Sequence, residues 1–324
     1  MILEQENALT TPPSKQLTLT IHPGGNLSEV ATVLSKHGFI KNPLLFLAQG
    51  YVFNYYQQLQ PGTYTLSDNL TPTQILDMLT QTSTAESQIH LTIPEGSTLL
   101  DIAQKVEALD ICTKNEFIQA SNALIYDFDF LYDIPDTIPY RLEGYLFPDT
   151  YFLTQNSTPE EIITMMLRRF DAIMSHYTSY LEDSPYTLHE VLTIASIIEN
   201  EARVASERPL ISGVIYNRLN HGMKLQMCST VQYSLENRKS ALTYEDLKTD
   251  SPYNTYKLDT LPIGPISCPG EAAIKAALSP SEHDYLYFVL KDPTSGTHAF
   301  SRTGSEHLAN KQTYESLNDP NFVD

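Results

Sequence analysis

The sequence has no tryptophan and only three cysteines among its 324 residues, Cys112, Cys228 and Cys268. The cysteines are odd in number and widely spaced, and neither a C-x-x-C pair nor an H-E-x-x-H run occurs. A structural zinc site or a zinc-dependent hydrolase therefore has little support, and we expect no metal and no cofactor. The lack of tryptophan is mildly unfavourable for a sugar-binding protein, although 20 tyrosines and 12 phenylalanines supply stacking faces.

Basic residues are also scarce. The chain has 20 Lys and Arg against 39 Asp and Glu, which gives a formal net charge of −19. Such a balance argues against nucleic acid or an anionic membrane surface as the main partner. The length is sufficient for at least one substantial core and predicts two or three domains.

Long hydrophobic runs are missing as well. No segment reaches the roughly 20 apolar residues of a membrane span, and the start of the chain does not read as a signal peptide. Taken alone, these features predict a cytoplasmic protein. A chain whose membrane anchor had been removed would look the same.

The most informative stretch that is present is T-L-H-E-V-L-T-I-A-S-I-I-E-N-E-A, at 187–202. Thr187 and Glu190 form a capping box, which predicts the start of a helix. The residues that follow are apolar on nearly every side, as expected for a buried helix. Glu201 continues the apolar stripe, so we expect its carboxyl group to be partly desolvated, with a raised pKa suited to proton donation.

Glu199 falls on a different face of this helix, and Arg203, four residues later, is its expected ion-pair partner. The two carboxylates could instead have a purely structural role. Carboxylates near a helix end are usually solvated or paired, and Arg203, Glu207 and Arg208 could complete an ordinary surface network with them.

The chain contains a candidate internal repeat. L-T-I-H-P-G-G-N-L-S-E-V-A from Leu19 aligns without a gap with L-T-I-P-E-G-S-T-L-L-D-I-A from Leu91. The shared residues are Leu, Thr, Ile, Gly, Leu and Ala, which suits one strand, one turn and one helix face in each copy. We interpret the pair as a duplicated strand-turn-helix unit, although short units of this kind can also converge by composition.

Other elements follow from capping signals and apolar periodicity. Helices are expected at 27–37, from Thr71, at 115–123, from Thr158, at 207–220 and at 272–278, and a strand at 285–290 is expected to pair with the segment from Thr297. The stretch from Arg141 and the Pro- and Gly-rich segment 251–270 suit no regular element. Long loops of this kind are usually functional or disordered, and the apolar content of 251–270 argues against disorder. Residues 80–88 read as a linker.

Three stretches together resemble the endolytic murein transglycosylases of the YceG-like (MltG) family: E-G-Y-L-F-P-D-T at 143–150, A-S-I-I-E-N-E-A at 195–202, and S-P-Y-N-T-Y with L-P-I-G-P-I within 251–266. The Y-L-Y-F-V and H-A-F-S segments near the end fit as well. The resemblance implies an α+β fold in which LysM-like strand-turn-helix modules precede a mixed α/β catalytic domain. The expected parts are a flexible tail at 1–16 that lacks the anchor region, an N-terminal α/β module at 17–88, a LysM-like unit and connection at 89–142, and the catalytic domain at 143–324.

The resemblance also implies an activity. Such an enzyme cleaves the bond between N-acetylmuramic acid and N-acetylglucosamine in nascent glycan strands and leaves 1,6-anhydro ends, with one Glu as the single general acid and base. It implies a single N-terminal membrane span, absent from this chain, and a catalytic domain on the outer face of the plasma membrane. Peptidoglycan strands are the expected partner, with cell-wall synthesis or division proteins as further partners and no nucleic acid.

Aligned with the family, the catalytic residue is Glu201, the second carboxylate of the E-x-E pair, supported by Glu199 and Glu143. The candidates for substrate binding, each of which could equally serve to structure a loop, are Tyr145, Asp149, Gln226, Thr230, Tyr253, Asn254 and Tyr256. One departure is visible: where relatives commonly carry Asp-Pro after L-Q-x, this chain has Cys228 and Ser229.

Two alternatives remain open from the sequence. A hydrolytic muramidase would use Glu201 as the acid and Glu199, Glu143 or Asp149 as a second carboxylate. Glu199 suits this role poorly, because side chains two residues apart on a helix point about 200° apart. A non-catalytic wall-binding scaffold that keeps only the fold is the second alternative.

Overall fold

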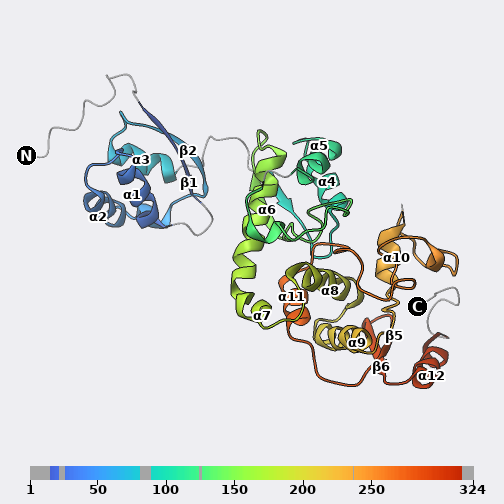
Figure 1. The fold of residues 1–324 in the computed structure, drawn as a ribbon. Coiled ribbons are helices and arrows are strands. Elements are labelled where there is room, and N and C mark those ends of the chain that lie inside the picture. Colours follow the sequence, from blue (N-terminus) through green and yellow to red (C-terminus); the bar gives the residue numbers. More distant parts are fainter. Residues whose placement is uncertain (1–14, 22–25, 81–88, 124–125, 236, 316–324) are drawn as a thin grey trace, which may run out of the picture. The chain divides into compact units, whose positions relative to one another are not determined.

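The computed structural model describes residues 15–21, 26–80, 89–123, 126–235 and 237–315 (Figure 1). The chain divides into two compact units, 1–89 and 90–324. Both combine helices with small two-stranded sheets, so the expected α+β class is confirmed. The turn expected in the first copy of the strand-turn-helix unit, at Gly24 and Gly25, lies outside the described residues, as do most of the linker and nearly all of the tail.

The first unit is built around one antiparallel strand pair. Leu19 and Ile21 are buried in the first strand while Thr18 and Thr20 are exposed, the alternation expected for a strand with one face on a core. Thr71 and Gln74 form the predicted capping interaction, with the Gln74 backbone N donating to Thr71 Oγ1 at 3.3 Å. The elements are β1 (Gln16–Ile21), α1 (Leu27–Lys36), α2 (Pro43–Val52), η2 (Tyr55–Gln57), β2 (Gly62–Ser67) and α3 (Pro72–Thr80).

The second unit opens with the second predicted strand-turn-helix copy. Its turn contains Gly96 in the left-handed region, at φ +76°, and Thr98 forms a capping box at the start of the helix. The copies pair with different strands, β1 with β2 and β3 with β4. This part comprises β3 (Ile89–Thr92), α4 (Leu99–Glu107), α5 (Lys114–Ser121), η3 (Asp129–Leu131), β4 (Thr150–Leu153), α6 (Pro159–Met174), η4 (Ser175–Tyr177) and α7 (Thr178–Glu182).

The helix predicted from Thr187 forms the centre of the remaining chain. It is α8 (Leu188–Glu201), its capping box is present, and every residue from Val191 to Ile198 is buried. Figure 1 shows α9 and α11 beside it. The other elements here are η5 (Ala205–Glu207), α9 (Arg208–Asn220), α10 (Cys228–Ser234), η6 (Asp246–Lys248) and α11 (Glu271–Leu278).

The Pro- and Gly-rich segment 251–270 is held along α8 by hydrogen bonds. The Ile266 backbone N donates to Ser196 Oγ at 3.0 Å, and Asn200 Nδ2 donates to the Ser267 hydroxyl at 2.7 Å. Because these bonds replace regular backbone pairing, the segment is ordered without being a helix or strand.

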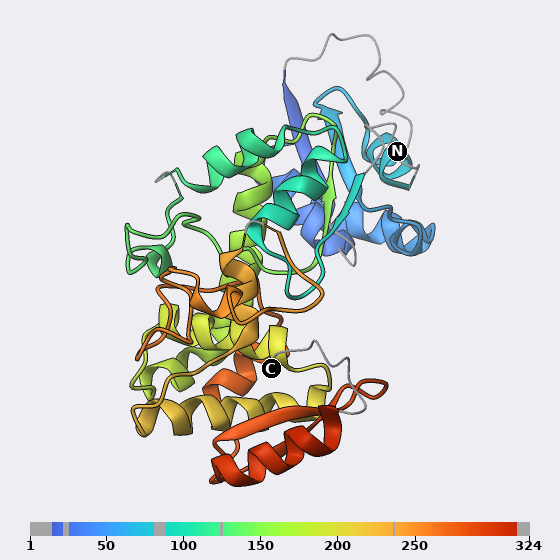
Figure 2. The same ribbon diagram turned by 90° about the vertical axis from the view of Figure 1, so that its right-hand side faces the viewer.

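The predicted hairpin near the end of the chain is confirmed. β5 (Tyr287–Asp292) pairs antiparallel with β6 (Thr297–Ser301), with Leu290 opposite His298. The final helix, α12 (Gly304–Glu315), packs against this hairpin (Figure 2).

Candidate functional site

Glu201 is the last residue of α8, and its side chain is half-buried. Its Oε1 accepts a hydrogen bond of 3.1 Å from the backbone N of Ser229, near the start of α10. Within the described part of the chain, Oε2 has no hydrogen-bond partner. One oxygen is thus held in place while the other is left for an external group.

Glu199 lies two residues earlier and has a different environment. Its side chain is only 6% exposed, and Oε1 accepts a hydrogen bond of 2.9 Å from Arg208 Nη2. Its Oε2 accepts from the backbone N of Gly270 at 3.0 Å. Both oxygens are therefore occupied by structural contacts.

The expected pairing of Glu199 with Arg203 is wrong. The helix ends at Glu201, and Ala202 is extended, with φ −86° and ψ 108°. The i,i+4 spacing brings side chains together only while the helix continues. Arg203 consequently leaves the helix face, and Arg208 takes its place.

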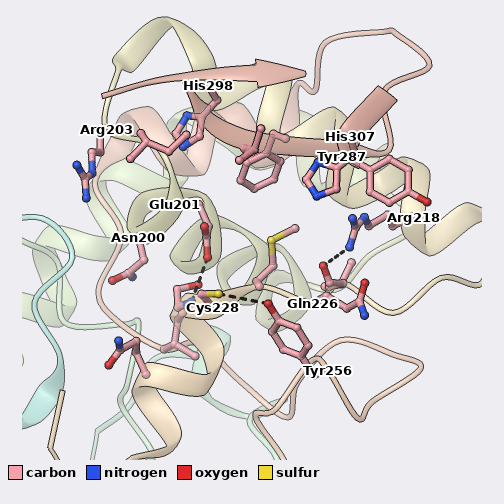
Figure 3. Close-up of a pocket in the computed structure, with 18 of the residues that line it drawn as sticks. Asn200, Glu201, Arg203, Arg218, Gln226, Cys228, Tyr256, Tyr287, His298 and His307 are labelled. Carbon is pink, nitrogen blue, oxygen red and sulfur yellow. Dashed lines mark hydrogen bonds between the residues drawn. The ribbon is translucent and has the colours of Figure 1, made fainter. Parts of the chain in front are cut away.

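Glu201 lines a pocket of about 550 Å³ (Figure 3). The walls come from the end of α8, from α9, from the start of α10 and the residues on either side of that helix, from the segment 251–270, from the β5–β6 hairpin and from α12. The lining residues are Asn200, Glu201, Arg203, Arg218, Leu225, Gln226, Met227, Cys228, Ser229, Gln232, Arg238, Lys239, Ser240, Tyr256, Ile266, Tyr287, Phe288, Val289, Leu290, His298, His307 and Lys311.

Two of the predicted binding residues, Gln226 and Tyr256, line this pocket together with Glu201. Gln226 has a left-handed backbone, at φ +53°, and its N–H donates to the Thr255 carbonyl at 3.1 Å. The hydroxyl of Tyr256 lies 3.3 Å from the Cys228 sulfur, a contact drawn as a dashed line in Figure 3.

Glu143 does not line the pocket. Its carboxyl group is buried and accepts hydrogen bonds of 3.0 Å from the backbone N of Leu99, at the start of α4, and from the Tyr233 hydroxyl. Burial raises the pKa of Glu143 from its ordinary value of 4.5 to about 8, against the lowering effect of these hydrogen bonds. The group therefore joins a helix start to α10 from inside the protein.

The five other predicted binding residues also lie outside the pocket lining. Each of them makes contacts with other parts of the protein that account for its presence in the motif. Asp149 pairs with Arg169 at 2.7 Å. Asn254 is fully buried and donates to two backbone carbonyls, at 2.7 and 3.0 Å. The remaining contacts are Tyr145 with His189 at 2.9 Å, Thr230 with Thr255 at 2.8 Å, and the Tyr253 ring with that of Tyr233 at 4.8 Å between centroids.

The hairpin residues of the pocket were missed by sequence reasoning. His298 lines it from β6, and its Nδ1 lies 2.7 Å from Oε2 of Glu207. Tyr287 lines it from β5. The segments that contain Tyr287 and His298 were part of the family resemblance, but the sequence assigned neither residue to the site.

The described residues contain no group of three or more His, Cys, Asp or Glu side chains placed to hold a metal ion. Across the same residues, no helix is both long enough and apolar enough to cross a membrane.

Comparison with known proteins places these features in a family. The YceG-like family matches residues 19–313. The endolytic murein transglycosylase of Bacillus subtilis is 34% identical over 93% of this chain and 85% of its own length. The endolytic murein transglycosylase of Streptococcus pneumoniae is 34% identical over 91% of this chain, which spans 58% of the pneumococcal protein.

A solved structure gives the same result. The 2.6 Å crystal structure of a YceG-like protein from Listeria monocytogenes covers 91% of this chain and 99% of its own, with a TM-score of 0.62 and 34% identity. The match to the family extends over nearly the whole chain and includes all three stretches that carry the resemblance, at 143–150, 195–202 and 251–266. The chain therefore belongs to the YceG-like family.

Proposed function

We propose that this protein is an endolytic murein transglycosylase, which cleaves peptidoglycan strands between N-acetylmuramic acid and N-acetylglucosamine and leaves 1,6-anhydro-muramyl ends. The observation that carries the proposal is the position of Glu201. Among the described residues that line the pocket, it is the one carboxylate, and one of its oxygens has no hydrogen-bond partner in that part of the chain. Its relatives' names supply the reaction class.

In the proposed mechanism, protonated Glu201 donates its proton to the glycosidic oxygen as the bond from that oxygen to C1 breaks. The carboxylate then accepts the proton of the muramyl 6-hydroxyl, whose oxygen closes on C1. The substrate's own N-acetyl group stabilises the positive charge at C1. Water is not consumed, and Glu201 is protonated again at the end, so one carboxylate suffices.

A hydrolytic muramidase is less well supported. Most glycosidases that hydrolyse their substrate require a second carboxyl group, roughly 5 to 9.5 Å from the acid. Glu199 is engaged by Arg208 and the Gly270 backbone N, and Glu143 is buried against Leu99 and Tyr233. The structural contacts of these two candidates favour the single-carboxylate reaction.

The remaining expectations from the family resemblance stand as part of this proposal. Residues 17–88 would be an N-terminal α/β module, 89–142 a LysM-like unit and connection, and 143–324 the catalytic domain. The enzyme would act on the outer face of the plasma membrane, attached by an N-terminal span, and would meet cell-wall synthesis or division proteins there.

The test is mass spectrometry of the soluble products formed from purified peptidoglycan by three proteins: wild type, Glu201→Gln and the matched control Glu199→Gln. Anhydro-muramyl ends are expected from wild type and from Glu199→Gln, provided circular dichroism shows that the latter is folded, and none from Glu201→Gln. Reducing ends would instead establish hydrolysis. If all three proteins gave identical product profiles, the proposed role of Glu201 would be wrong. An absence of products from all three would favour the non-catalytic wall-binding scaffold.

A further inference from the structure

The charge around Glu201 is opposite to the charge of the whole protein. Among the described residues that line the pocket, five are Lys or Arg and only one is Asp or Glu, whereas the whole sequence has 20 Lys and Arg against 39 Asp and Glu. These cations come from separate parts of the chain: Arg203 follows α8, Arg218 lies in α9, Arg238 and Lys239 follow α10, and Lys311 lies in α12. Figure 3 shows Arg203 and Arg218 on opposite sides of Glu201.

Two of the five cations have structural roles. Arg218 is buried, and its guanidinium donates to the carbonyls of Leu286 and Leu225, each at 2.6 Å. Lys239 pairs with Asp246 at 2.6 Å. These contacts hold the pocket walls together and leave Arg218 and Lys239 less able to serve a ligand.

Arg203 and Arg238 are exposed and form no ion pair with any residue that the structure describes. The Arg203 side chain is positioned by the hairpin turn. A Cβ atom added to Gly296, in that turn, would lie only 2.8 Å from the Cβ atom of Arg203. Guanidinium groups of this kind suit carboxylates and phosphates, which they can bind through two parallel hydrogen bonds.

We propose that the pocket recognises anionic groups carried by the glycan strand, and that Arg203 and Arg238 bind them. This inference rests on the proposed function. The sugar rings of peptidoglycan are uncharged where the lactyl group is amide-linked to peptide, so the anions are the carboxylates of the peptide branches or a phosphate at the end of a strand still joined to its lipid carrier. A protein with net charge −19 repels such a polymer at long range, and a local cluster of cations lets the strand approach at Glu201.

The experiment measures the dissociation constant of fluorescent, soluble glycan-peptide strands by anisotropy in a Glu201→Gln background, so that no turnover is needed. Arg203→Gln with Arg238→Gln is expected to weaken binding about tenfold and to reduce its dependence on salt. Lys105→Gln removes the same type of charge from an exposed site on α4 outside the pocket and is expected to change binding less than twofold.

Two substrates distinguish the source of the anion. Strands whose carboxylates have been converted to methylamides should bind wild type and the double variant equally weakly if the peptide carboxylates are recognised. If only strands with a terminal phosphate show the difference, the phosphate is the ligand. Equal binding of all strands by wild type and the double variant, or an equal loss with Lys105→Gln, would overturn the proposal. The binding assay uses the Glu201→Gln background and does not depend on catalysis. If the wild-type protein formed no product in the assay of the previous subsection, that result would count against the proposed function alone.

Discussion

Glu207 accepts two hydrogen bonds from His298, one of 2.9 Å from its backbone N to Oε1 and one of 2.7 Å from its Nδ1 to Oε2. The two side chains are only 11% and 8% exposed. Glu207 ends η5, shortly after Glu201, and His298 lies in β6. The pair therefore attaches the hairpin wall of the pocket to the chain that leaves α8. It leaves Nε2 as the ring atom that His298 can offer to a ligand.

Glu207→Ala should lower the free energy of unfolding by about 3 kcal/mol, because two nearly buried donors of His298 lose their acceptor. It should also lower activity, since the hairpin loses its attachment next to Glu201. Urea unfolding and product formation measure the two effects. Glu245→Ala is the control, because its pair with Lys248 is exposed and should contribute at most about 0.5 kcal/mol. Equal unfolding midpoints for the two variants would contradict this role.

Gly144→Ala should destabilise the second unit by about 3 kcal/mol. Gly144 has φ +86°, and an added Cβ would lie 2.5 Å from Cβ of Pro265, in the loop held along α8. Backbone strain and a clash with a ring add to each other here. Gly222→Ala is a matched control, because its φ is +63° with nothing within 4 Å of an added Cβ. It should cost only the strain, about 1 kcal/mol. Thermal unfolding of both variants distinguishes the two terms, and a loss for Gly144→Ala no larger than the control would exclude the clash.

Glu143 should make stability fall as pH rises. Its pKa is raised from 4.5 to about 8 in the folded protein, chiefly by burial. Between these values the folded state keeps a proton that the unfolded state has released, so the contribution is complete below pH 4.5 and is lost as pH increases to 8. The slope is at most about 1.4 kcal/mol per pH unit. Glu143→Gln imitates the protonated group and should flatten the curve of unfolding free energy against pH, while transglycosylase activity at pH 7 persists. A curve with the same slope as wild type would show that Glu143 does not bind this proton.

The helices were largely predictable because their signals are local. Thr158 and Thr187 each form the capping box that the sequence indicates, and the apolar period of α8 placed Glu199 and Glu201 on different faces. The pairing of Glu199 failed because a helix end depends on tertiary contacts: the Ser229 backbone holds Glu201, and Arg208 holds Glu199.

The pocket was less predictable than the helix that supplies its carboxylate. Its hairpin wall comes from residues almost 100 positions after Glu201, and whether Tyr287 and His298 face that carboxylate depends on how the hairpin packs. Motif residues such as Asn254 look like candidates for ligand binding because polar residues in loops often bind ligands. In an irregular segment, however, backbone carbonyls also need donors, and Asn254 supplies two of them.

Alkylation of Cys228 should inactivate the enzyme. Cys228 lines the pocket at the start of α10, beside the residue whose N–H holds Glu201, so a maleimide adduct would occupy space that a sugar needs. Burial raises the pKa of both other thiols, Cys112 and Cys268, which keeps their reactive thiolate scarce near neutral pH. We expect N-ethylmaleimide to lower activity more than about tenfold in wild type and in Cys112→Ala, and to leave Cys228→Ala active.

Peptide mass spectrometry identifies the modified residue in the same samples. The adduct on Cys228 should accumulate with the time course of inactivation, because one event causes the other. Full activity in protein whose Cys228 is completely modified would show that this wall of the pocket lies outside the path of the substrate. Inactivation that persists in Cys228→Ala would place the sensitive thiol at Cys112 or Cys268, neither of which lines the pocket.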